Sequence, residues 1–147
     1  MITFNLFAVT NFKQLLSKIL EWREKYNGIN QTQWQRVRFD TPYLKEPIIF
    51  DMNILPKQEF MPYMHESLDD IKQNLNKNDV CKFSDLEYER FSRVVDYMET
   101  TVYDENKVQE AKRNFFNWFT EYDRRRDTDI CKTFPELEKF YLECGNE

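Results

Sequence analysis

The chain has 147 residues, a formal net charge of −5 at pH 7 and 16% aromatic residues. This length predicts one domain with a sizeable buried core, and the aromatic content excludes an intrinsically disordered chain. The acidic balance gives no general attraction to nucleic acid or to an anionic membrane, so we expect neither as a partner. Glycine occurs only twice, which excludes Gly-rich phosphate-binding loops of the Walker or dinucleotide type.

The chain carries no pattern typical of export. Met1 is followed by Ile-Thr-Phe-Asn without a basic region or a cleavage site, and no apolar run approaches about 18 residues. Cys81, Cys131 and Cys144 are odd in number and far apart in sequence, which is typical of reduced thiols rather than a disulfide framework. We therefore expect a cytoplasmic protein.

The first third of the chain predicts a βαβ unit. Residues 2–9 are a nearly continuous apolar run of strand-forming residues, which predicts a strand buried on both faces. A helical pattern follows, opened by Asn11 as its cap and ended near Gly28, where glycine supplies a left-handed conformation. Residues 37–40 predict a second short strand. We therefore expect an α/β fold, with the βαβ portion over residues 1–55.

Residues 56–147 predict a mostly helical C-terminal region. Capping boxes at residues 84–87 and 133–136 indicate two helix starts, and Asp104 indicates a third. The helix after Asp104 carries the aromatic cluster at residues 115–119. Its helical spacing favours core packing over base stacking, because no basic groove accompanies it.

The predicted first strand lacks neighbours. Two strands do not form a stable parallel sheet, because such sheets are covered on both faces and usually contain more strands. We therefore expect either a partner that supplies the missing strands or a larger α/β protein whose C-terminal part is this chain. We favour the second interpretation.

Most of this chain resembles the C-terminal half of radical SAM proteins, above all those found in phages with a twitch-type C-terminal region. The similar segments are residues 5–16 (NLFAVTNFKQLL), 36–47 (RVRFDTPYLKEP), 53–56 (NILP), 82–89 (KFSDLEYE), 116–126 (FNWFTEYDRRR) and 133–136 (TFPE). The resemblance implies that the βαβ unit belongs to a partial β/α barrel, and that this chain completes the barrel and the substrate side of the site.

The cofactors are implied by the resemblance alone. In that family a Cys-x3-Cys-x2-Cys loop holds a [4Fe–4S] cluster whose open iron binds S-adenosylmethionine. The three cysteines of this chain lack that spacing. The resemblance therefore implies that the missing N-terminal barrel half is a partner, in the same polypeptide or in a separate chain.

Four residues are candidates for contact with the cofactor or the substrate. Ligands of β/α barrels bind at the C-terminal ends of the strands. By analogy with the family, Asn5, Arg38, Asp40 and Tyr43 take this role, and no catalytic or metal-binding residue is predicted. A structural interpretation stays open for each of them; Asp40, for example, suits a turn before a proline.

A second hypothesis is a small non-catalytic helical interaction protein whose aromatic stripe docks a partner. It predicts an exposed apolar patch on the last two helices, whereas the radical SAM hypothesis predicts exposed apolar surface along the first strand and its helix. Two further patterns favour structural roles. His65, the only histidine, is expected on an exposed helix face, and Arg124–Arg126, flanked by acidic residues, are expected to form a paired, solvated helix end.

Overall fold

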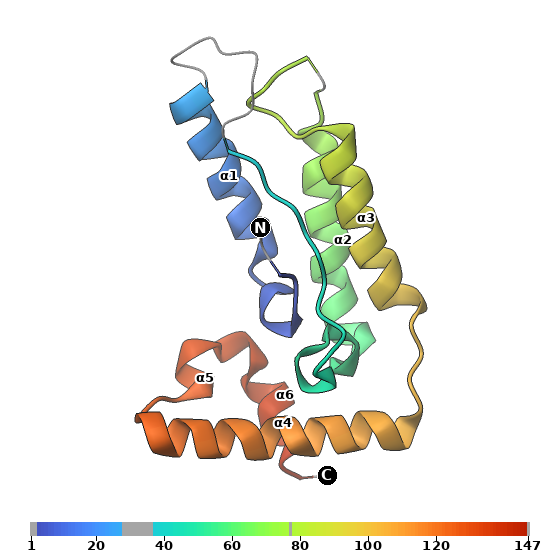
Figure 1. The fold of residues 1–147 in the computed structure, drawn as a ribbon, viewed down its shortest axis with the longest axis vertical. Helices are drawn as coiled ribbons and strands as arrows, with labels where there is room; N and C mark the ends of the chain where they lie inside the picture. Colours follow the sequence, from blue (N-terminus) through green and yellow to red (C-terminus); the bar gives the residue numbers. More distant parts are fainter. Residues whose placement is uncertain (1–2, 28–36, 77, 147) are drawn as a thin grey trace.

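The structure is a computed structural model that describes residues 3–27, 37–76 and 78–146. Its helices are α1 (Phe12–Asn27), α2 (Lys57–Gln73), α3 (Asp85–Thr100), α4 (Glu105–Arg126), α5 (Ile130–Thr133) and α6 (Glu138–Cys144), with short 3-10 helices η1 (Leu6–Ala8), η3 (Ile48–Phe50), η4 (Met52–Ile54) and η5 (Pro135–Leu137). Helices α1, α2 and α3 run along the long axis, and α4 lies across one end of them (Figure 1). No described helix is long and apolar enough to cross a membrane.

The predicted α/β fold is wrong. Over the described residues the chain forms no β-strand, and therefore neither a βαβ unit nor part of a β/α barrel. Isolated bridges are the only strand-like pairings there, and they join Phe4 to Tyr43 and Leu75 to Phe83. The described part of the first segment turns into η1 instead, because the Asn5 side chain accepts a hydrogen bond from the Phe7 N–H at 3.1 Å. Such a local bond occupies a backbone N–H that would otherwise pair with a neighbouring strand.

The two segments predicted as strands nevertheless lie side by side. The Phe4 N–H donates to the Pro42 carbonyl at 2.7 Å, and the Leu44 N–H donates to the Phe4 carbonyl at 2.8 Å. This is the parallel pattern that a βαβ unit requires, but it extends over one residue pair only. We call residues 37–45, which run extended along the helices, the 37–45 segment.

The chain's own helices cover the N-terminal segment. Phe4, Leu6 and Val9 are fully buried, and the Phe4 ring lies 5.0 Å from the Phe12 ring and 5.7 Å from the Phe91 ring, measured between centroids. The sequence therefore predicted the burial of this segment correctly, but the burial is supplied by helices and not by a sheet. The exposed apolar surface that the radical SAM hypothesis predicts is contradicted for this segment.

The helix starts follow the sequence in part. At α3 the capping box is confirmed: the Ser84 hydroxyl accepts from the Glu87 N–H, and the Glu87 carboxylate accepts from the Ser84 N–H at 3.0 Å. The Asp104 side chain caps α4, as predicted. Helix α1 spans the predicted residues, and its predicted cap at Gly28 lies outside the described residues.

The predicted capping box at residues 133–136 is wrong. Thr133 ends the short helix α5, which Asp129 caps by accepting a hydrogen bond from the Lys132 N–H at 3.1 Å. The Glu136 carboxylate is bound elsewhere, because it accepts hydrogen bonds from the Thr10 hydroxyl and from the Asn11 side chain. The Asn11 amide therefore tethers the start of α1 to the C-terminal helices.

A buried arginine joins α1 to α3 and to the 37–45 segment. Arg23 is fully buried and forms a bidentate ion pair with the Glu87 carboxylate, with nitrogen–oxygen distances of 2.5 and 3.3 Å. Its guanidinium also donates to the carbonyls of Val37 and Lys82, each at 2.9 Å. A buried charge needs hydrogen-bond partners, and these contacts give each of the three guanidinium nitrogens at least one acceptor.

Candidate functional site

An aromatic cavity of about 350 Å³ lies between η3, α4 and α5. Most of its wall is aromatic, contributed by Phe7, Phe50, Trp118, Phe119, Tyr122 and Phe134. The rest of the wall consists of Asp123, Thr128, Ile130 and Thr133. A concave, mainly apolar site of this size is the kind that buries a small ligand or a side chain of a partner.

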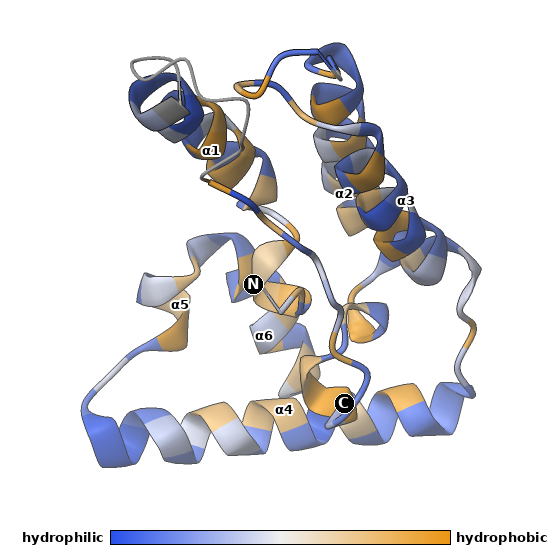
Figure 2. Cartoon of the chain, turned by 45° about the horizontal axis from the view of Figure 1, so that its top comes forward, coloured by the Kyte–Doolittle hydropathy of each residue, from blue (hydrophilic) through white to orange (hydrophobic). Residues whose placement is uncertain are grey.

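Helix α4 positions one side of the cavity. Its hydrophobic residues lie between two hydrophilic ends (Figure 2). Phe115 and Phe119, one helical turn apart, are buried as predicted. Trp118 and Tyr122 lie on the neighbouring face, where their rings stack at 5.0 Å. Trp118 was expected to face inward, but 42% of it is exposed, so that prediction is wrong and the residue lies at the mouth of the cavity.

The turn after α4 holds the opposite wall in place. Asp127 adopts a left-handed conformation, with φ of 52°, and so reverses the chain at the end of the helix. The Asp123 carboxylate then accepts hydrogen bonds from the Thr128 hydroxyl at 2.7 Å and from the Ile130 N–H at 2.9 Å. Because these bonds already engage Asp123, the cavity presents mainly apolar surface to a ligand.

A second, more polar hollow of about 740 Å³ adjoins the cavity and shares Trp118 and Tyr122 with it. Arg124 and Arg125 form ion pairs with the Glu121 carboxylate at 2.7 and 2.5 Å, which confirms the paired helix end predicted for these arginines. Their hydrogen bonds lower the pKa of the Glu121 carboxyl to about 2. The third arginine of the run, Arg126, lies 5.3 Å from the centre of the Tyr122 ring. The rim of the cavity is therefore cationic on this side.

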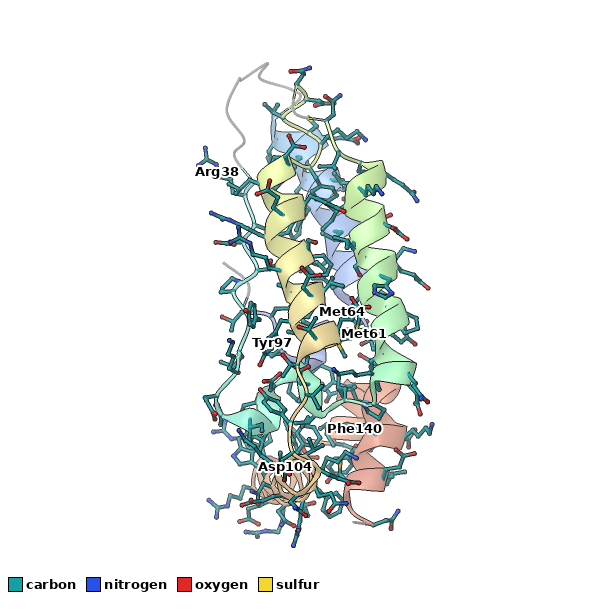
Figure 3. The ribbon with its side chains drawn as sticks, turned by 90° about the vertical axis from the view of Figure 1, so that its right-hand side faces the viewer. Arg38, Met61, Met64, Tyr97, Asp104 and Phe140 are labelled. Atoms are coloured by element: carbon teal, nitrogen blue, oxygen red, sulfur yellow. The ribbon has the colours of Figure 1, made fainter. Side chains whose placement is uncertain are left out.

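Three of the four predicted site residues lie along the 37–45 segment, in two hollows that share Asp40 and Arg90 of α3. There Asp40 forms an ion pair with Arg90 of α3 at 2.9 Å, and Tyr43 lies farther along the same segment. Arg38 is exposed, as Figure 3 shows, and it lines a neighbouring hollow together with Asp40. Asn5 lies apart from this group and caps η1. None of the four lines the aromatic cavity.

The cysteines do not fit a [4Fe–4S] cluster. Cys81 lies between α2 and α3, Cys131 lies in α5 and Cys144 in α6. Within the described ranges no three His, Cys, Asp or Glu side chains lie close enough together to hold a metal ion. Burial raises the pKa of the Cys81 and Cys131 thiols, which favours their protonated form. His65 is exposed on α2, as predicted.

The sequence pattern missed the cavity because its walls come from distant segments. Phe7 lies in η1, Phe50 lies in η3 and Phe134 lies between α5 and η5. Only the aromatic cluster of α4 was visible as a local signal. Comparison of the chain with protein-family models, with curated proteins and with solved structures finds no match.

Proposed function

We propose that this chain is a non-catalytic helical interaction protein that docks a partner through the aromatic cavity. The observation that carries this proposal is the preformed cavity with Trp118 exposed at its mouth. Partly exposed aromatic side chains beside a pocket are typical centres of binding energy in protein interfaces. The barrel-completing role in a radical SAM enzyme depends on an α/β fold, which the described residues do not form.

The partner is inferred to be an acidic peptide segment that also carries a large apolar side chain. Aliphatic or aromatic groups complement the apolar wall, since Asp123 is already engaged with Thr128 and Ile130. Next to the cavity, Arg125 and Arg126 line the polar hollow, where Arg125 is already paired with Glu121. A carboxylate of the partner would pair with the Arg126 guanidinium, because guanidinium groups favour planar, bidentate contacts.

A peptide selection tests this function directly. Random peptides from a displayed library are selected for binding to the full chain. The affinity of the enriched peptides is then measured for the parent chain, for the Trp118→Ala variant and for the Trp22→Ala variant. Trp22 is a matched control because it is exposed to a similar degree, 38% against 42%, but lies on α1. Circular dichroism checks that both variants keep the helical content of the parent chain.

The expected result is a set of peptides with a large apolar residue beside Asp or Glu. Trp118→Ala should weaken their binding at least about tenfold, whereas Trp22→Ala leaves it within about twofold. Arg126→Glu should also weaken it, because a carboxylate then faces the acidic peptide. Equal losses for the two tryptophan variants, or enriched peptides without an apolar anchor, would show that the cavity is not the docking site.

A further inference from the structure

We propose that a separate hollow, between the 37–45 segment and α3, binds the phosphate group of a small molecule. The hollow measures about 430 Å³, and Lys45, Arg90 and Arg93 contribute cations to its wall. Asp40 is the carboxylate among the residues that line it, so three positive charges stand against one negative charge. The hollow therefore has a net charge of +2 on a chain whose net charge is −5, and a phosphate dianion complements that charge.

An aromatic pair positions the lysine. The rings of Tyr43 and Tyr97 stack at 4.3 Å, and the Lys45 ammonium nitrogen lies 5.3 Å from the first ring centre and 4.9 Å from the second. Tyr97 lies in α3 on the side of the 37–45 segment (Figure 3), and its hydroxyl donates to the buried Asp51 carboxylate at 2.6 Å. The lysine thus rests on a platform that is anchored in the core.

The two arginines reach the hollow from successive positions on one face of α3. Arg90 and Arg93 are three residues apart, which places their side chains next to each other on the helix. Arg90 is held by the Asp40 carboxylate, whereas Arg93 forms no ion pair with any described residue. Arg93 and Lys45 therefore supply donors that no carboxylate of the described chain satisfies, and phosphate oxygens are acceptors for such donors.

A single phosphate group fits this hollow better than a polyanion does. Nucleic acid needs an extended basic surface, and the acidic balance of the whole chain opposes it. Free phosphate and a phosphate monoester share the chemistry that the hollow recognises. This proposal is independent of the docking function, because the hollow and the aromatic cavity have no lining residue in common.

The test is a titration of the isotope-labelled full chain followed by amide NMR shifts. Inorganic phosphate and phenyl phosphate are added separately at constant ionic strength, and sodium chloride alone serves as the reference titration. We expect saturable shifts that are confined to the 37–45 segment and to the α3 residues beside it. Lys45→Gln and Arg93→Gln should each weaken phosphate binding at least about tenfold, because each removes a charged donor.

Arg113→Gln is the matched control, because Arg113 is an exposed arginine of α4 that does not line the hollow. Its phosphate affinity should equal that of the parent chain. Tighter binding of phenyl phosphate supports a phosphorylated organic molecule as the ligand, and equal or weaker binding supports free phosphate. The proposal would be overturned by shifts that sodium chloride alone reproduces, or by shifts that do not saturate with phosphate. It would also be overturned if the Lys45→Gln and Arg93→Gln variants bound phosphate as tightly as Arg113→Gln does.

Discussion

Replacing the buried arginine of α1 should destabilise the whole fold. Arg23→Met keeps much of the side-chain volume but removes the guanidinium that pairs with Glu87, whose side chain is only 7% exposed. The carbonyls of Val37 and Lys82 lose their donor at the same time. The variant therefore leaves the buried Glu87 carboxylate without a cationic partner and removes a donor from two partly buried carbonyls.

The expected cost follows from these contacts. Removal of one partner of a buried ion pair typically lowers the free energy of unfolding by about 3–5 kcal/mol. Glu87 keeps its hydrogen bonds from the backbone and hydroxyl of Ser84, which favours the lower end, about 3 kcal/mol. For a chain of this length that corresponds to a fall of about 6–12 °C in Tm. The total free energy of unfolding of a typical domain is only about 5–15 kcal/mol, so the loss is large.

Urea unfolding at pH 7, followed by far-ultraviolet circular dichroism, measures this cost. The control is Arg124→Met, which breaks the ion pair between Glu121 and an arginine side chain that is 68% exposed. This variant should leave the urea midpoint nearly unchanged, because water screens exposed ion pairs. Adding Glu87→Gln to Arg23→Met should recover part of the loss, since it removes the unpaired buried charge. If Arg23→Met costs no more than the surface control, the pair does not hold α1 to α3.

Two further predictions concern the caps and the tyrosines. Ser84→Ala should lower the free energy of unfolding by about 1 kcal/mol in the same urea assay, because it removes the hydroxyl that accepts from the Glu87 N–H; an unchanged midpoint would contradict this role of the cap. Burial and hydrogen bonds to Asp51 raise the pKa of Tyr97 and Tyr103. The unfolded chain therefore loses these protons at about pH 10 while the folded chain retains them, so stability falls as the pH rises above 10. Between pH 9 and 11 the Tm should fall more steeply with pH for the parent chain than for Tyr97→Phe. Equal slopes would contradict the raised pKa of the Tyr97 phenol.

Local signals in the sequence predicted most of the helical framework. The Ser84 box and the Asp104 cap start α3 and α4, and the helical spacing buries Phe115 and Phe119. These features depend on residues within one or two turns, so sequence alone determines them. The strand predicted at residues 2–9 failed for the opposite reason. A short apolar run reports burial, but its periodicity does not say whether a sheet or a set of helices covers it.

Only the tertiary structure decided which distant residues meet. Arg23 and Glu87 are 64 residues apart, and no local spacing predicts their ion pair. Arg38, Asp40 and Tyr43 stood out in the sequence, but Arg90, which forms an ion pair with Asp40, was not predicted to be a partner. The walls of the aromatic cavity likewise come from several short elements. Side chains on different elements become neighbours only through helix packing, which buries apolar faces and thereby sets the distances across which charges and rings interact.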